Sequence, residues 1–129
     1  MPPTQSPFRF RLDNGSGVPV YRQLIDQVQA GIATGTLCVG AQIPTVRQVA
    51  VDLAINPNTV MRAYRELEIR GVLDTQQGTG TFIAARVPQI EDDGRVRRLD
   101  QLIDEFVARA GAGGFTLAEV VDALKERGK

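Results

Sequence analysis

The sequence contains no histidine, and this absence excludes several kinds of functional site. A Ser-His-Asp triad, a Cys-His pair and a zinc site with imidazole ligands all need histidine. The single cysteine, Cys38, allows neither an internal disulfide bond nor a site with several thiolates. We therefore expect no enzyme, no metal ion and no cofactor. A metal site at Asp100, Asp104 and Glu105 is the weaker alternative to ordinary charges on a helix surface.

Long hydrophobic runs and an excess of one charge are also missing. No apolar stretch approaches the roughly 18 residues of a membrane-spanning helix, and the first residues lack the basic and apolar regions of a secretory signal. We expect a cytoplasmic protein without a membrane partner. The 15 basic and 15 acidic residues cancel, and this balance taken alone argues against a strongly basic nucleic-acid binder.

The charges are nevertheless distributed unevenly along the chain. Residues 1–86 contain 8 arginines and 6 acidic residues, whereas residues 87–129 contain 7 basic and 9 acidic residues. A chain of 129 residues, 43% of them hydrophobic, can bury a core. We expect an N-terminal arm over residues 1–17, a globular domain over residues 18–86 and a helical region over residues 87–129.

Apolar residues at helical spacing predict two helices before residue 55. Pro19 suits the first turn of a helix, because proline loses no hydrogen bond there, and Gly35 suits the end. The buried face of this first helix is predicted to comprise Tyr21, Leu24, Ile25, Val28 and Ile32. Thr45 and Gln48 have the spacing of a capping box and predict a second, short helix.

A third helix and a β-hairpin are predicted to follow. Asn56 suits the N-cap of the helix, Pro57 its first position and Gly71 its end. Two short β-like runs, at residues 72–75 and 81–84, flank a turn that contains glycine. The predicted fold class is therefore mainly α with a small β-hairpin (α+β), in the order of a winged helix-turn-helix.

The two helices on either side of the turn before Asn56 indicate a helix-turn-helix. The small Ala50 lets the helices cross closely, and Val60 is placed to lock them together. The second helix of such a pair can enter the major groove of DNA, where asparagine can pair with adenine and the helix N-terminus attracts phosphate. The candidate DNA-binding residues are Arg47, Asn56, Asn58, Thr59, Arg62, Gly78 and Thr79.

Most of these residues have a purely structural alternative. Asn56 can be only a helix cap, and Arg62 and Arg65 can form weak surface pairs with Glu66. Gly78 can be required only because a tight turn needs a positive φ. A winged helix that binds another protein, and never DNA, is the alternative function.

The region after residue 86 is predicted to form two helices that pair subunits into a homodimer. Its apolar residues recur at spacings of three and four, and Thr116 with Glu119 forms a second capping box. The candidate dimerisation residues are Val96, Leu99, Leu102, Ile103, Phe106, Leu117, Val120, Val121 and Leu124. Packing between the two helices of one chain would account for part of this surface.

The segment at residues 8–12 and the single cysteine allow two further structural predictions. The alternation at residues 8–12 predicts a short strand or an extended arm, or a tail whose two phenylalanines dock loosely. Cys38 is expected to be a small buried side chain, because no second thiol or basic cluster adjoins it in the sequence.

Five ordered motifs resemble the GntR family of bacterial transcription regulators. They are PVYRQL at 19–24, QIPTVR at 42–47, NPNTV at 56–60, ELEIRG at 66–71 and GTGTF at 78–82. In that family this region is an N-terminal winged helix that binds operator DNA as a dimer. The NPNTV run and the short C-terminal region resemble the YtrA subfamily. Its members usually carry a small helical dimerisation region, and many repress neighbouring genes for ABC transporters.

The resemblance implies a homodimeric repressor on a palindromic, inverted-repeat operator of double-stranded DNA. Carried over by motif position, the DNA contacts come from Arg47, Asn56, Asn58, Thr59 and Gly78. Pro57 and Met61 depart from the family at large, which often has arginine at these positions. The base preference is therefore expected to differ from that of better-known branches. No effector molecule is implied by these motifs.

Overall fold

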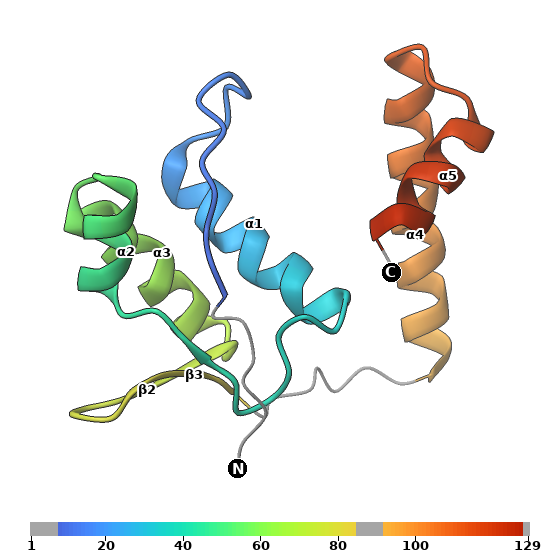
Figure 1. The fold of residues 1–129 in the computed structure, drawn as a ribbon. Helices are drawn as coiled ribbons and strands as arrows, with labels where there is room; N and C mark the ends of the chain where they lie inside the picture. Colours follow the sequence, from blue (N-terminus) through green and yellow to red (C-terminus); the bar gives the residue numbers. More distant parts are fainter. Residues whose placement is uncertain (1–7, 85–91, 128–129) are drawn as a thin grey trace. The chain divides into compact units, whose positions relative to one another are not determined.

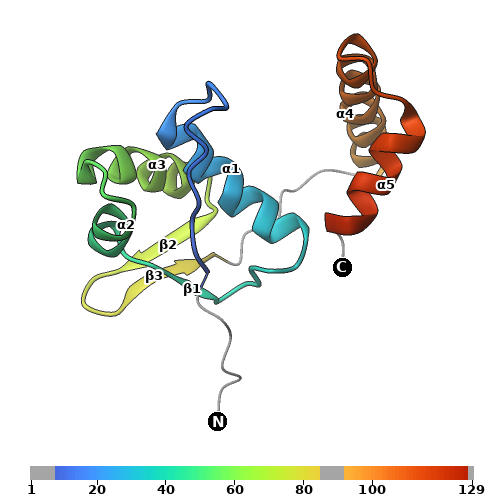
Figure 2. The same cartoon turned by 45° about the horizontal axis from the view of Figure 1, so that its top comes forward.

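A computed structural model describes residues 8–84 and 92–127 of the chain. The chain divides into two compact units, with the division between Arg86 and Val87. Within the described residues, the first unit contains three helices and a three-stranded sheet, and the second contains two helices (Figure 1 and Figure 2). The predicted mainly helical α+β fold class is confirmed.

Helix α1, Val20–Ala33, supplies one side of the core of the first unit. It begins directly after Pro19 and ends before Gly35, whose φ of +82° is easily adopted only by glycine. The predicted apolar face is buried at Leu24, Ile25 and Val28, whereas Ile32 at the end of the helix is exposed. This face packs against α3.

Helices α2, Val46–Leu53, and α3, Pro57–Ile69, form the predicted helix-turn-helix. The turn between them is tight because Ala54 adopts a left-handed conformation, with φ of +54°. Ala50 and Val60 are both buried where the two helices meet, as their spacing predicted. The predicted capping box at the start of α2 is also present, since the Thr45 and Gln48 side chains each accept the other residue's backbone N–H.

The sheet has one more strand than the sequence predicted. Strands β2, Leu73–Gln76, and β3, Gly80–Ile83, form the expected antiparallel hairpin, each shifted by one residue from the prediction. Strand β1, Gln42–Ile43, pairs with the other edge of β3, which gives the order β1-β3-β2. Two residues carry no periodic pattern, so only the tertiary pairing of β1 with β3 identifies this strand.

The described part of the N-terminal arm is extended and firmly docked, and it is neither a paired strand nor a loose tail. Phe10 is buried in the core, and Phe8 contacts its ring edge to face at 4.9 Å between centroids. The Gln27 side chain accepts the Arg11 backbone N–H and donates to the Arg11 carbonyl. Gln23, one turn earlier on α1, holds Asp13 in the same way. Residues 1–7 lie outside the described residues.

The expectation that Cys38 is buried is wrong, because its side chain is exposed. The neighbouring Leu37 takes the buried place instead and packs closely over Gly31 of α1. Cys38 lies between two turns, and its side chain contacts the Gly35 carbonyl at the surface.

The second unit is a pair of helices, α4 at Asp92–Ala112 and α5 at Leu117–Arg127. Thr116 and Glu119 form the predicted capping box at the start of α5. The backbone N–H and hydroxyl of Thr116 donate to the Glu119 carboxylate and hold its pKa below the usual value. No residue from 94 to 127 is buried, so the two helices by themselves enclose no core.

Tyr64 of α3 connects the third helix to the start of the second. Its ring is buried, and its hydroxyl donates a hydrogen bond to the carbonyl of Pro44, next to the cap residue Thr45. Burial raises the pKa of Tyr64 above the usual value for tyrosine, because the ionised form is poorly solvated there. The neutral hydroxyl therefore holds the first turn of α2 in place relative to α3.

We predict that Tyr64→Phe lowers the free energy of unfolding by about 0.5–1.5 kcal/mol, the usual net value of one hydrogen bond. Because the folded pKa lies above the unfolded one, the stability due to the neutral tyrosine is complete below about pH 10 and decreases above it. The variant should therefore lose less stability than the natural chain above that pH. Urea denaturation at pH 7 and in the alkaline range measures both effects, and identical curves for the two proteins would contradict the role of Tyr64.

Candidate nucleic-acid interface

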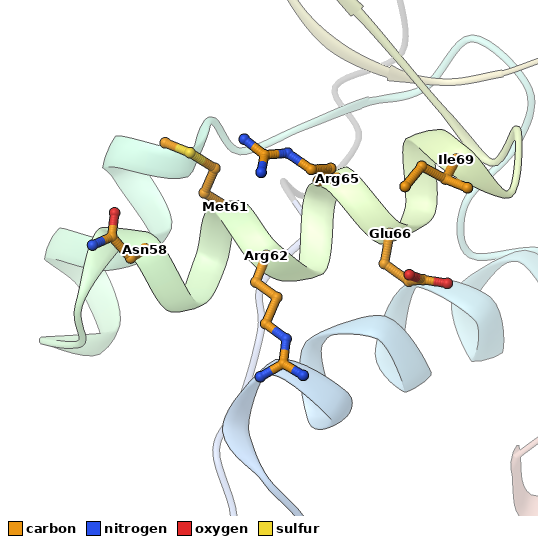
Figure 3. A pocket seen from close by; sticks show the side chains of 6 residues that line it. All are labelled: Asn58, Met61, Arg62, Arg65, Glu66 and Ile69. Atoms are coloured by element: carbon orange, nitrogen blue, oxygen red, sulfur yellow. The ribbon is translucent and has the colours of Figure 1, made fainter.

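The outer surface of α3 carries two of the candidate residues, Asn58 and Arg62. Six of its side chains line an open pocket: Asn58, Met61, Arg62, Arg65, Glu66 and Ile69. Figure 3 shows that Met61, Arg65 and Ile69 extend toward one side of the helix, as their helical spacing requires, and that Asn58 lies at its N-terminal end. Arg62 and Glu66 extend on the side of α1. The helix therefore presents one mixed polar and apolar face, with one arginine and one glutamate at its edge.

The N-terminus of α3 holds the two asparagines singled out in the sequence. The side-chain oxygen of Asn56 accepts the backbone N–H of Asn58 at 2.8 Å, so Asn56 is a helix cap, as one alternative required. The carboxamide of Asn58 is exposed and, among the described residues, makes no hydrogen bond. Thr59 is half-buried. Of the three side chains, that of Asn58 is the most available to read a base edge.

Arg47 lies in the first turn of α2 and is exposed. Within residues 8–84 and 92–127, it pairs with no carboxylate. The bond from Tyr64 to Pro44 fixes the start of α2 relative to α3, and so it also fixes the backbone that carries Arg47. Helix α2 thus presents Arg47, and helix α3 presents Asn58, each near the N-terminal end of its helix.

Arg62 makes a contact that the sequence did not predict. Its guanidinium lies over the ring of Tyr21 in α1, with 3.7 Å between the guanidinium carbon and the ring centroid. The alternative of a surface pair between Arg62 and Glu66 is not found among the described residues, where Glu66 pairs with Arg70 at 3.0 Å. Tyr21 appeared in the sequence only as a member of an apolar helix face. Its contact with Arg62 depends on the packing of α1 against α3, which no local pattern reveals.

The turn between β2 and β3 contains the other candidates, Gly78 and Thr79. Gly78 has a φ of +79° and Gly80 a φ of +140°, so the turn needs glycine at both positions for conformational reasons. The side chain of Gln42 in β1 occupies the space that a Cβ at Gly80 would need, and its amide donates to the Thr79 carbonyl at 3.4 Å. Gln42 therefore supports the tip of the hairpin, a role that sequence reasoning missed.

The candidate dimerisation residues all lie on α4 and α5. With the exception of the half-buried Val120, they are exposed in the single chain, by 38% to 61% of their surface. Those on α4 are Val96, Leu99, Leu102, Ile103 and Phe106, and those on α5 are Leu117, Val120, Val121 and Leu124. Packing within one chain thus leaves a substantial part of this apolar surface uncovered.

Other kinds of site find no support in the described residues. No group of three or more cysteine, aspartate or glutamate side chains between residues 8–84 and 92–127 is arranged to hold a metal ion. None of the helices in this part of the chain is long and apolar enough to span a membrane.

The chain is similar to known regulatory proteins over most of its length. Residues 20–83 match the family described as bacterial regulatory proteins, gntR family. The chain is 33% identical over 110 residues to the HTH-type transcriptional regulator YhcF of Bacillus subtilis, and this match covers 85% of this chain and 90% of YhcF. It is 30% identical over 116 residues to the HTH-type transcriptional repressor YtrA of the same organism, and this match covers 90% of this chain and 89% of YtrA. The matched family and both relatives are regulators and not enzymes.

A solved structure of a DNA complex is also similar. The DNA-binding domain of AraR, crystallised with its operator ORX1, has a TM-score of 0.53 and 26% sequence identity to this chain. The match covers 60% of this chain and 99% of that domain. A domain of this fold in a GntR-type regulator therefore binds operator DNA in at least one relative.

The capping bond of Asn56 gives a prediction that separates capping from base reading. Asn56→Ala should lower the free energy of unfolding by about 1 kcal/mol. Asn56→Ser should keep most of this stability, because serine also caps helices well. If Asn56 acts only as a cap, Asn56→Ser should also bind operator DNA like the natural chain. Urea denaturation and a binding titration measure the two properties. A stable serine variant with weakened binding would assign the Asn56 side chain a DNA contact.

Proposed function

The chain belongs to the GntR family of bacterial regulatory proteins, and on this premise we propose that it is a homodimeric, sequence-specific transcriptional repressor that binds an inverted-repeat operator. The observation that carries the proposal is the outer surface of α3, where Asn58, Arg62 and Arg65 are exposed and unpaired among the described residues. Such a helix, with an exposed N-terminal end and short polar side chains in its first turn, suits the major groove.

Within this proposal, each candidate residue has a distinct task. Asn58 reads a base edge, since a carboxamide can pair bidentately with adenine. Arg47 and Arg62 contact phosphates on either side of the groove, and the capped N-terminus of α3 adds a favourable dipole. Thr59 and Asn56 keep the first turn of α3 in register. The hairpin tip at Gly78 and Thr79 approaches the DNA backbone, because a turn without side chains at its glycines allows close contact.

The second part of the proposal is that α4 and α5 pair with the same helices of a second copy of this chain. Nine apolar side chains at helical spacing leave a partly exposed apolar surface in the single chain, and its removal from water is worth about 25 cal/mol for each Å² buried. A face of this kind is typical of a subunit interface. A two-fold pair of subunits presents two copies of α3, and this symmetry requires an operator with two inverted half-sites.

The remaining points of the proposal rest on the relatives alone. The name of the YtrA relative supports repression. Control of ABC transporter genes rests on the resemblance to the YtrA subfamily. A DNA-binding regulator of a bacterium acts in the cytoplasm, where the chromosome lies.

We predict a strong salt dependence of DNA binding. Phosphate contacts from Arg47 and Arg62 of both subunits involve four phosphates, so the slope of log affinity against log salt should be about −3.6 or steeper. The measurement is a titration of the full chain with fragments selected from a random DNA pool, repeated across salt concentrations. A flat slope without an enriched sequence would instead support the alternative of a winged helix that binds only proteins.

The same fragments test the assignment of Asn58. Asn58→Ala should cost about 1–3 kcal/mol on the selected operator and should relax the preference at one position of each half-site. Binding to unrelated DNA should stay as it is in the natural chain. An equal loss on both kinds of DNA would place Asn58 at the backbone rather than at a base.

The proposed dimer gives a further prediction. Leu99→Asp should shift the protein toward monomer and weaken operator binding, because it places a charge in an apolar interface. Sedimentation velocity measures the oligomeric state. The matched control is Val39→Asp, which makes the same kind of change at a valine of the first unit that is 65% exposed. Dimers of equal stability in all three proteins would show that the interface lies elsewhere.

A further inference from the structure

The contact between Tyr21 and Arg62 joins two helices through a residue of the proposed DNA-binding surface. The guanidinium carbon of Arg62 lies 3.7 Å from the centroid of the Tyr21 ring. Arg62 is itself exposed, and among the described residues no carboxylate neutralises it. Its nearest acidic neighbour on the same face of the helix, Glu66, pairs with Arg70 instead. Arg62 therefore keeps its full positive charge at a defined place on the surface.

Stacking on an aromatic ring uses only one face of a guanidinium. The N–H groups lie in the plane of the guanidinium, so they remain available to donate to another group. The ring of Tyr21 is in turn well supported, because it is half-buried on α1 beside the buried Leu24 and Ile25. A long, flexible arginine side chain is thus held by a nearly rigid platform before any ligand binds.

The direction of Arg62 indicates which part of DNA it meets. Figure 3 shows Arg62 extending from α3 toward α1, away from the side on which Met61, Arg65 and Ile69 lie, whereas Asn58 lies at the N-terminal end of the helix. When this N-terminal end is turned to the base edges, a side chain that extends sideways from the helix is directed toward the wall of the groove. The walls of the groove are formed by the phosphate backbone.

We propose that Tyr21 is a positioning residue that holds Arg62 ready for a DNA phosphate at the edge of the groove entered by α3. This inference rests on the proposed function and deepens it. It assigns Arg62 to the DNA backbone and leaves base recognition to other side chains. The benefit of the stack is a smaller loss of side-chain freedom when Arg62 binds the phosphate. The stack therefore strengthens binding by at most its own interaction energy, because it raises the population of the Arg62 conformer that binds.

The test is a double-mutant cycle on the full chain, with a DNA fragment selected from a random pool as the probe. Tyr21→Leu should weaken binding about two- to fivefold for each subunit, the value of an exposed cation–π contact. Tyr21→Phe should bind like the natural chain, because it keeps the ring. In the background of Arg62→Ala, Tyr21→Leu should cause no further loss. The same loss in both backgrounds would mean that Tyr21 only supports the fold, and an unaltered affinity of Tyr21→Leu would equally overturn the inference.

The salt dependence tests the phosphate contact itself. Arg62→Ala should lower the magnitude of the salt slope by about 0.9 for each subunit, whereas Tyr21→Leu should keep the slope. Arg70→Ala is the matched control, because it removes the same charge at the C-cap of the same helix, from the pair with Glu66, and its slope should equal that of the natural chain. A normal slope for Arg62→Ala would overturn the inference. The proposed function fails separately, if the natural chain itself has a flat slope.

A second variant covers the case in which Tyr21→Leu does not fold, which urea denaturation reveals. Arg62→Lys keeps the positive charge but loses the planar group that stacks and donates in a fork. It should keep the salt slope and bind more weakly than the natural chain by a factor similar to that expected for Tyr21→Leu. Full affinity of Arg62→Lys would contradict a role for the stack.

Discussion

The burial of one face of α3 against α1 is the interaction on which the first unit depends. Val60, Ala63 and Leu67 have no exposed surface, and each of the two larger side chains contributes about 1.5–3 kcal/mol by its removal from water. Because a helix has only one orientation that buries this face, the opposite face must point to solvent. The position of Asn58 on the surface is therefore a consequence of core packing. The same packing brings Tyr21 of α1 beneath Arg62, so the packing of the core also determines where the charge of Arg62 lies.

Local hydrogen bonds then make this orientation more exact. Asn56 caps the start of α3, the reciprocal bonds of Thr45 and Gln48 cap α2, and Tyr64 joins the two helices through the Pro44 carbonyl. In a helix-turn-helix that reads base edges, the first turn of the second helix must be held in one place. A small displacement of its side chains breaks their hydrogen bonds with the bases. The zero net charge of the chain fits this design. A protein without a broad positive field must rely on a few arginines in defined positions.

The second unit, in contrast to the first, has no buried core. In α4 and α5 most apolar side chains remain exposed, and no residue between 94 and 127 is buried. Two helices have too little mutual surface to cover nine apolar residues, so a partner surface would add to the stability of this unit. In the proposed dimer, folding of this region and association of the subunits are one process. The affinity for an operator then depends on the concentration of the chain as well as on its contacts with DNA.

The sequence by itself determined the order of the helices, their caps and most of the side chains that the helices of the first unit bury. These features are local: the bonds of Thr45, Asn56 and Thr116 involve residues at most three positions apart, and the period of the apolar residues selects the buried face. The tertiary structure alone decided the third strand, the exposure of Cys38 and the supports given by Gln42 and Tyr21. Each of these joins residues distant in the chain, or depends on which of two neighbours the core accepts. No local pattern encodes such a choice, because it is settled only when the helices and the sheet compete for the same space.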